Sequence, residues 1–358
     1  MQALLGDRKR WEQNRDGGDL RGWRRGPAGL DSEGVEAAAF RRSLQNGPGA
    51  WLVMNRSNAD SLGPWLAERL GVDLVQSTPV AGGCIHEAWC LQLADGGRLF
   101  AKTNEVGCLP LLEAEADGLA ALAAVAEPAG LVVPEPRALG VMAERAVLVL
   151  SWLPLAPRGE AEGWGRLGAA LARLHRLSLS EPTAVPAAAF GWSIDNFIGA
   201  GPQANGWLED WGRFFTERRL APQLRRLAES GTALRRVEDL LEQVPRWLAG
   251  HAPDPCLVHG DLWSGNAALL SDGRGALFDP SVHRADREVD LAMARLFGGV
   301  PAAFFEGYEA IWPLPAGHQR RVELYNLYHL LNHANLFGGG YRNQAQASIL
   351  RLLEDPPG

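Results

Sequence analysis

Leu257-Val258-His259-Gly260-Asp261-Leu262-Trp263-Ser264-Gly265-Asn266 is followed, a few residues later, by Leu277-Phe278-Asp279-Pro280. Asp261 and Asn266 have the D-x-x-x-x-N spacing of a kinase catalytic loop. We expect a strand over residues 267–270, a turn, and a strand over 276–278 that brings Asp279 to the same pocket. The pattern predicts a phosphoryl-transfer site of the kinase type.

Each residue of this set suits phosphoryl transfer. ATP reacts through a loose transition state, so a protein contributes mainly positioning and charge neutralisation by magnesium. Mg²⁺ prefers oxygen ligands, which Asn266 and Asp279 supply as an amide and a carboxylate. Asp261 is then the candidate base that accepts or orients the proton of the acceptor hydroxyl. Either fragment alone fits an ordinary turn or strand end, but the two together favour catalysis.

A glycine pair upstream indicates where nucleotide phosphates could bind. Residues 74–80 and 87–93 are expected to form two strands, and the segment between them contains Gly82 and Gly83. Glycines let the backbone approach phosphates closely, as in the glycine-rich loop of a kinase. The same pair also fits a simple hairpin, so only the catalytic residues downstream favour the phosphate-binding interpretation.

Lys102 lies on the next predicted strand, residues 98–104. A kinase needs a lysine on its third strand to hold the ATP phosphates, and a glutamate on a helix to position that lysine. The predicted helix over 111–124 offers Glu113 and Glu115 as partners. A solvated surface acid is the alternative for each of them.

These elements predict an α+β protein with a two-lobed, protein-kinase-like fold. We expect an ATP-binding N-lobe with a small β-sheet over residues 59–153 and a larger, mainly helical C-lobe over 154–358, which carries the catalytic and substrate-binding residues. Residues 1–58 are expected to be a disordered or mis-annotated N-terminal extension, because Asp7–Arg25 show no helical or strand period. A translation start at Met54 is the alternative.

Composition excludes several classes of protein. The 358 residues are 46% hydrophobic and 22% charged, which is ordinary for a globular protein of two lobes. No apolar run reaches the ~20 residues of a membrane-spanning helix, so no membrane partner is expected. A net charge of −7 gives no basic footprint for nucleic acid. The four cysteines form no CxxC pair, which favours a reduced, cytoplasmic protein without a zinc site or disulfide scaffold.

Longer stretches resemble the fructosamine kinase, or ketosamine-3-kinase, family, which is related to aminoglycoside phosphotransferases. The resemblance extends from about Asp60 to about Leu353 and is carried by residues 259–266 (HGDLWSGN), 286–293 (DREVDLAM) and 324–333 (LYNLYHLLNH). It implies that ATP and Mg²⁺ are the cofactors and that the 3-hydroxyl of a ketosamine is phosphorylated. Such a reaction makes sugar-amine adducts unstable and would serve deglycation repair. The family's Ala-Glu-Ala pattern favours Glu115 as the partner of Lys102.

The resemblance also indicates residues that could contact the acceptor, either a free or a protein-bound fructosamine or ribulosamine. Aromatic rings stack on sugar faces, and amides and carboxylates bond hydroxyl groups or a cationic amine. Packing against the core, local turns and pairing with neighbouring charges are the alternatives. The candidates are Trp192, Asp195, Asn196, Trp263, Asp286 and Glu288.

Two questions stay open at this level. Cys84 lies in the glycine-rich segment, where a thiol could link two copies into a redox-dependent homodimer; a small residue in a monomer is the alternative. An aminoglycoside or choline phosphotransferase would share His-Gly-Asp but lacks the Leu-Trp-Ser-Gly continuation. A non-catalytic nucleotide-binding module is disfavoured because Lys102, Asp261, Asn266 and Asp279 are all present.

Overall fold

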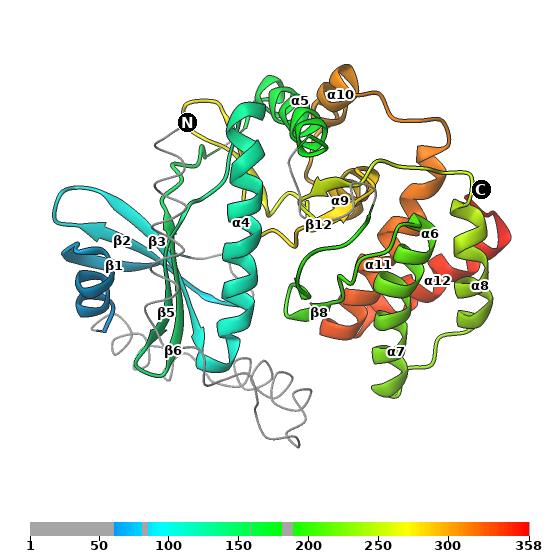
Figure 1. Ribbon diagram of the computed structural model, residues 1–358, viewed down its shortest axis with the longest axis horizontal. Helices are drawn as coiled ribbons and strands as arrows, with labels where there is room; N and C mark the ends of the chain where they lie inside the picture. The colour runs from blue at the N-terminus through cyan, green and yellow to red at the C-terminus, as the bar shows by residue number, and fades with distance from the viewer. Residues whose placement is uncertain (1–60, 81–84, 158, 181–188, 358) are drawn as a thin grey trace. The chain divides into compact units, whose positions relative to one another are not determined.

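The computed structural model describes residues 61–80, 85–157, 159–180 and 189–357 (Figure 1). The chain divides into two compact units. Of the described residues, unit 1 contains those up to Ala116 together with Glu135–Trp152, and unit 2 contains Asp117–Pro134 and those from Leu153 onward. The predictions for residues 1–58, Gly82, Gly83 and Cys84 concern positions outside the described residues.

Unit 1 is built on a five-stranded antiparallel sheet with the order β1-β2-β3-β6-β5 (Figure 1). β1 and β2 have the expected bounds, and β2 alternates between buried and half-buried residues along its length. Lys102 lies on β3 between Ala88 of β2 and Leu148 of β6. The strands are β1 (Leu74–Val80), β2 (Glu87–Leu93), β3 (Arg98–Glu105), β5 (Pro136–Met142) and β6 (Arg145–Ser151).

The core of unit 1 lies between this sheet and a helix over residues 61–70. Leu62, Trp65 and Leu66 recur at helical spacing and are buried against the strands, including Trp89 of β2. The indole Nε1 of Trp65 donates to the carbonyl of Val141, so its one polar atom is satisfied. The sheet therefore has one covered face that fixes its register.

Helix α4 (Leu109–Ala129) follows the short η2 (Val106–Cys108) and is longer than the helix predicted over 111–124. It ends at Gly130, whose φ of +87° is a conformation that glycine adopts without steric cost. The short strand β4 (Leu131–Val132) then pairs in parallel with β11 of unit 2.

Four short strands of unit 2 frame the segment with the predicted catalytic residues. β9 (Cys256–Val258) pairs with β12 (His283–Ala285), and β10 (Ala267–Leu269) pairs with β11 (Gly275–Leu277). The register of the second pair sets Ala267 opposite Leu277. This hairpin agrees with the prediction, and it brings its two open ends together.

Helices α5 (Ala161–Ser178) and α10 (Ala302–Ile311) pack closely through glycines. A Cβ at Gly168 would overlap the carbonyl of Phe304, and a Cβ at Gly307 would overlap that of Gly165. The two helix backbones therefore come so close that only glycine fits at Gly168 and Gly307.

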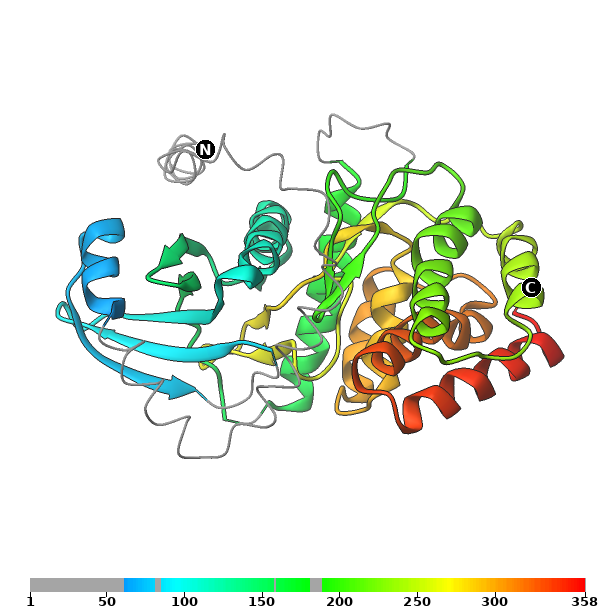
Figure 2. The ribbon, with the colours of Figure 1, turned by 90° about the horizontal axis from the view of Figure 1, so that it is seen from below.

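The remaining helices of unit 2 surround an aromatic core. Trp211, Phe214, Phe215 and Tyr325 are buried there, with ring centroids 5.2–5.9 Å apart in several of the pairs. Helices α11 and α12 lie side by side in both ribbon views (Figures 1 and 2). The elements are α6 (Trp211–Phe214), the π-helical η3 (Phe215–Leu220), α7 (Ala221–Glu229), α8 (Val237–Leu248), α9 (Glu288–Leu296), α11 (His318–Phe337), α12 (Gly340–Glu354) and the hairpin strands β7 (Asn196–Ile198) and β8 (Gly201–Gln203).

The sheet of unit 1 and the helices of unit 2 confirm the expected α+β class. Among the described residues, the search for a helix that could cross a membrane finds none.

Candidate active site

The predicted catalytic loop begins where β9 ends. Gly260 has a φ of +81°, and a Cβ at this position would overlap the carbonyl oxygen of Ser281. The amide of Ser281 in turn donates to the carbonyl of His259 at 2.8 Å. The loop therefore turns sharply against the segment that follows Asp279, and only glycine fits at the turn.

Asp290, on the first turn of α9, holds the backbone of this loop. Its Oδ2 accepts from the amide of His259 and its Oδ1 from the amide of Gly260, both at 2.8 Å. Asp290 thus ties the loop to α9. His175 of α5 lies 3.2 Å from Oδ2 and also contacts the hydroxyl of Tyr308 at 2.8 Å, so both of its ring nitrogens have a partner in the interior. Burial raises the pKa of Asp290, but the hydrogen bonds that its carboxylate accepts outweigh this effect and hold the pKa below its usual value.

His259 joins the loop to the end of β11. Its Nε2 lies 2.9 Å from the carbonyl of Phe278, and its Nδ1 lies 3.3 Å from the amide of Asp261. The first contact requires a proton on Nε2 and the second requires a bare Nδ1, so the pattern assigns a neutral ring. Complete burial lowers the pKa of His259 in the same sense.

Asp261, Asn266 and Asp279 are brought together as predicted. The amide Nδ2 of Asn266 donates to the backbone carbonyl of Asp261 at 2.9 Å and to its carboxylate at 3.2 Å. It also lies 3.4 Å from the carbonyl of Asp279. Asp279 has a φ of +56°, a conformation that is uncommon outside glycine and that is found at functional sites.

The carboxylate of Asp261 is in a setting suited to proton exchange. Burial and the nearby charge of Asp279 raise the pKa of Asp261 to about 7, although the hydrogen bond from Asn266 acts in the opposite direction. A candidate general base functions best when its pKa is near the working pH. The site therefore combines a proton acceptor with a second carboxylate that repels it.

Asn266 and Asp279 fit a magnesium ion by their chemistry. Because Nδ2 of Asn266 is used within the loop, its Oδ1 remains available as an oxygen ligand. A cation at Asp279 would also offset the repulsion between the two carboxylates. One amide oxygen, one carboxylate and nucleotide phosphates are sufficient for Mg²⁺, which retains several waters.

In unit 1, Lys102 and Glu115 form a buried ion pair. The distance from Nζ to Oε1 is 2.7 Å, and the side chains are 8% and 10% exposed. The contact expected between these two residues is present. A lysine held in this way presents its charge at a fixed point on β3. Its role, and that of Gly82 and Gly83, in binding ATP stays a prediction.

The first three substrate candidates lie just before β7 and at its first residue, and they differ in exposure. Trp192 is half-buried and donates from Nε1 to Asp117 at 2.8 Å. Asp195 is exposed and accepts from the backbone amide of Asn205. Asn196 is 4% exposed, donates to the carbonyl of Val282 and is engaged in the interior. Only Asp195 and the ring of Trp192 offer surface to a ligand.

Trp263 lies in the catalytic loop, and its side chain is 37% exposed. Its backbone carbonyl accepts from the amide of Asn266 at 3.0 Å, so the tryptophan is part of the same tight turn as the metal-ligand candidate. The role of this ring in contacting an acceptor stays a prediction.

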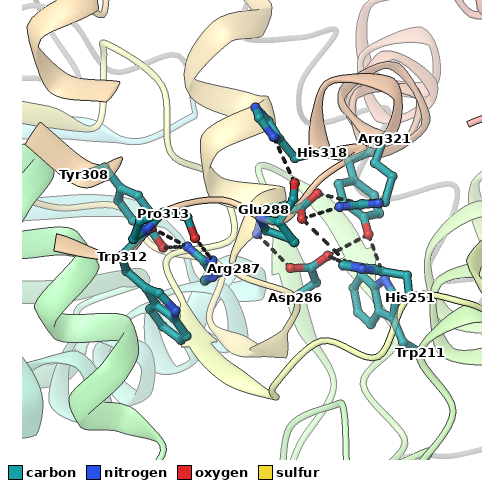
Figure 3. Close-up of polar contacts among 12 residues, drawn as sticks. Trp211, His251, Asp286, Arg287, Glu288, Tyr308, Trp312, Pro313, His318 and Arg321 are labelled. Atoms are coloured by element: carbon teal, nitrogen blue, oxygen red, sulfur yellow. Dashed lines mark hydrogen bonds and ion pairs between the residues drawn. The ribbon is translucent and has the colours of Figure 1, made fainter. Parts of the chain in front are cut away.

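Asp286 and Glu288 are buried and paired with neighbouring side chains (Figure 3). Asp286 is 1% exposed and contacts His251 and the hydroxyl of Tyr325, both at 2.7 Å. Glu288 is 4% exposed and accepts two bonds from Arg321, at 2.7 and 2.8 Å. Pairing with neighbouring charges, the alternative considered for these acids, describes them better, so we do not propose them as substrate ligands.

Sequence reasoning missed a buried polar network beside the loop. Gln203 donates to Asn196 at 2.8 Å and accepts from Tyr328 at 2.8 Å. Arg219, 1% exposed, donates to Asn205 at 2.7 Å and lies over the rings of Phe214 and Tyr328. Burial lowers the pKa of Arg219 to about 10, so it remains a cation. The local sequence gives no sign of this network, because its members come from three distant segments.

Comparisons with known proteins identify relatives across most of the chain. The family model described as fructosamine kinase matches residues 62–355. A probable ketoamine kinase of Synechocystis sp. is 44% identical over 275 residues, which cover 76% of this chain and 89% of that protein. The chloroplastic protein-ribulosamine 3-kinase of Arabidopsis thaliana is 31% identical over 312 residues, 85% of this chain and 92% of that protein.

Solved structures that resemble this chain include members of the same family. A candidate fructosamine-3-kinase from Haemophilus somnus has a TM-score of 0.73 at 27% identity, over 82% of this chain and 97% of that one. One from Thermobifida fusca has a TM-score of 0.69 at 29% identity, over 82% of this chain and 99% of that one. A macrolide 2'-phosphotransferase from Brachybacterium faecium, 20% identical with a TM-score of 0.51 over 84% of this chain and 99% of that one, shares the fold.

Proposed function

The chain belongs to the fructosamine kinase family, and we propose that it transfers the terminal phosphoryl group of ATP to the 3-hydroxyl of a ketosamine. The names of its relatives, ketoamine kinase and protein-ribulosamine 3-kinase, support this acceptor class. The product would be an unstable adduct from which the amine is recovered. We propose a cytoplasmic deglycation activity on free or protein-bound adducts.

In the proposed mechanism, Asp261 accepts or orients the proton of the attacking hydroxyl. Its raised pKa suits this exchange. Asn266 holds the Asp261 carboxylate through Nδ2 and keeps Oδ1 for a metal. Asp290 holds the two backbone amides just before Asp261 and so fixes the position of the loop from which this carboxylate extends.

Lys102, held by Glu115, is the proposed phosphate ligand on unit 1. Asn266 and Asp279 are the proposed magnesium ligands on unit 2. When bound, Mg²⁺ would neutralise charge on the phosphate oxygens. The protein would then supply mainly positioning, which fits a loop fixed by so many backbone bonds.

The observation that carries this proposal is the convergence of Asp261, Asn266 and Asp279 within one hydrogen-bonded loop. A nucleotide-binding module without catalysis would need no carboxylate with a pKa of about 7 at this place.

The test is ATP consumption on a panel of acceptors: fructoselysine, ribuloselysine, psicoselysine, choline and kanamycin. We expect turnover on the first three, and a loss of about 100-fold to 10,000-fold in kcat for Asp261→Asn, because general base catalysis contributes about that factor. Asp272→Asn is the matched control, since Asp272 is an exposed acid in the hairpin turn. Turnover restricted to choline or kanamycin, or an active Asp261→Asn protein, would contradict the proposal.

A further inference from the structure

An exposed group of aromatic side chains begins at Trp263 and continues away from the catalytic loop. Among the described residues, the tryptophan and phenylalanine side chains classed as exposed are Trp263, Phe297 and Phe337, at 37%, 37% and 49%. All three belong to one set of contacting rings on unit 2. We call this set the aromatic cluster; it consists of Trp263, Phe297, His333, Phe337 and Tyr341.

The rings contact one another in series. The centroid of Trp263 lies 6.3 Å from that of Phe297 in an edge-on arrangement, and Phe297 lies 4.8 Å from His333. His333 is 5.0 Å from Tyr341 and 5.4 Å from Phe337. These separations are typical of interacting aromatic pairs, so the cluster is an ordered surface rather than scattered apolar residues.

Glycines lie along the base of the cluster. A Cβ at Gly265 would overlap the indole of Trp263, so this ring lies directly over the loop backbone. Phe297 is followed by Gly298 and Gly299, with φ of +71° and +85°, and Phe337 is followed by glycines as well. The chain can therefore turn immediately after these rings without side chains that would cover them.

The cluster is continuous with the proposed reacting site. Asn266, which bonds the Asp261 carboxylate, also donates its amide to the carbonyl of Trp263. An acceptor with its hydroxyl at Asp261 thus has the cluster beside it.

We propose that the aromatic cluster binds the amine substituent of the acceptor, and that it favours substituents that are aromatic or long and aliphatic. This inference rests on the proposed function. In a ketosamine the nitrogen is attached two carbons from the phosphorylated position, so its substituent starts close to the reacting hydroxyl. A sugar ring needs hydrogen-bond partners, whereas the outer rings of the cluster offer mainly apolar faces.

The histidine of the cluster is compatible with an apolar ligand. Nδ1 of His333 lies 2.9 Å from the carbonyl of His329, which uses its proton within α11. Burial lowers the pKa of His333, so the ring is neutral at neutral pH. The neutral imidazole of His333 therefore adds a flat ring face to the cluster and does not add a positive charge.

The test compares two acceptors with the same sugar, the fructose adducts of benzylamine and of methylamine. Phe297→Ala and, as a second variant with a more exposed side chain, Phe337→Ala each remove one ring. We expect the ratio of kcat/KM for the benzyl adduct to that for the methyl adduct to fall about fivefold to tenfold, the effect of losing one aromatic contact. The control, Leu177→Ala, removes an apolar side chain of similar exposure outside the cluster and should leave the ratio unchanged.

The outcomes separate the possibilities. A ratio that stays constant in both variants, with turnover retained, contradicts the subsite but not the kinase. A wild-type dimer that becomes monomeric in the variants by light scattering would assign the cluster to a second copy of the chain and overturn the inference. Absence of ATP consumption with both adducts contradicts the proposed function itself, and the subsite with it.

Discussion

At the scale of single residues, the buried position of Asp261 beside Asp279 leads to a prediction for the pH dependence of kcat/KM. Burial and Asp279 raise its pKa to about 7, and only the ionised form accepts a proton. We expect kcat/KM to fall about tenfold per pH unit below pH ~7. The acid limb of kcat, measured with saturating Mg-ATP, should lie at lower pH because a cation at Asp279 relieves the repulsion.

The raised pKa of Asp261 also predicts that its contribution to stability falls as the pH rises, whereas the activity rises. A carboxyl whose pKa is raised by folding stabilises the protein at low pH, and this stabilisation is lost as the pH rises through the folded pKa. Asp261→Asn should therefore raise the melting temperature most at pH 8, by a smaller amount at pH 5, and hardly at all below pH ~3.8, where the carboxyl is protonated in the unfolded chain as well. A kcat/KM that is constant between about pH 5.5 and 7.5, or a variant that melts at a lower temperature than the wild type at pH 8, would show that folding does not raise the pKa of Asp261.

Residue types and their spacing in the sequence predict the candidate catalytic residues better than they predict which side chains pack around the site. The distance between Asp261, Asn266 and Asp279 in sequence is a local property of one loop and one hairpin, so a pattern can report it. The burial of Asp286 and Glu288 is not local, because it depends on Arg321 and Tyr325, which approach from a helix far along the chain. Charge in a sequence does not reveal such partners.

At the scale of elements, the contact between α5 and α10 depends on missing side chains. A methyl group at Gly168 would overlap the carbonyl of Phe304, which belongs to helix backbone and cannot move aside. We expect Gly168→Ala to lower the free energy of unfolding by about 3 kcal/mol, the upper end of the range for overpacking. Urea unfolding measures this effect.

Gly165→Ala on the same helix is the matched control. Its Cβ would meet its nearest atom at 3.4 Å, an ordinary contact, and alanine favours a helix over glycine by roughly 0.5–1 kcal/mol. The two substitutions should thus differ in sign. Equal effects would mean that the helices separate easily and that their close approach contributes little.

Strand and helix bounds were predictable where a single pattern dominated. β2 alternates between buried and half-buried residues, turn residues lie beside both β1 and β2, and the predicted limits of both strands were correct. The end of α4 was missed by five residues, because it is set by Gly130 and by packing rather than by its apolar period. The π-helical turn Phe215–Leu220 was not predicted.

At the scale of the whole molecule, buried neutral histidines link stability to pH. Burial lowers the pKa of His259, His283 and His329, the last to about 3. Below pH ~6.5 the unfolded chain binds protons that the folded protein excludes, so the free energy of unfolding should fall by up to ~1.4 kcal/mol per pH unit per histidine. Urea unfolding at a series of pH values measures the slope.

His329→Gln isolates one of these contributions. Nδ1 of His329 is buried without a hydrogen-bond partner among the described residues, so removing the imidazole should cost little at neutral pH. The pH slope between about 5 and 6.5 should decrease by roughly one proton. An unchanged slope would mean that His329 is protonated in the folded protein as well.

The β10–β11 hairpin affects how relatives of this chain can be recognised in genomes. Asn266 and Asp279 lie at its open end, and the exposed residues Asp272 and Arg274 form its closed end. Lengthening the turn would move neither catalytic residue, whereas adding one residue to a strand would shift the pairing register and turn every side chain to the opposite face. A search pattern should therefore fix the interval from Asp261 to Asn266 and let the interval from Asn266 to Asp279 vary.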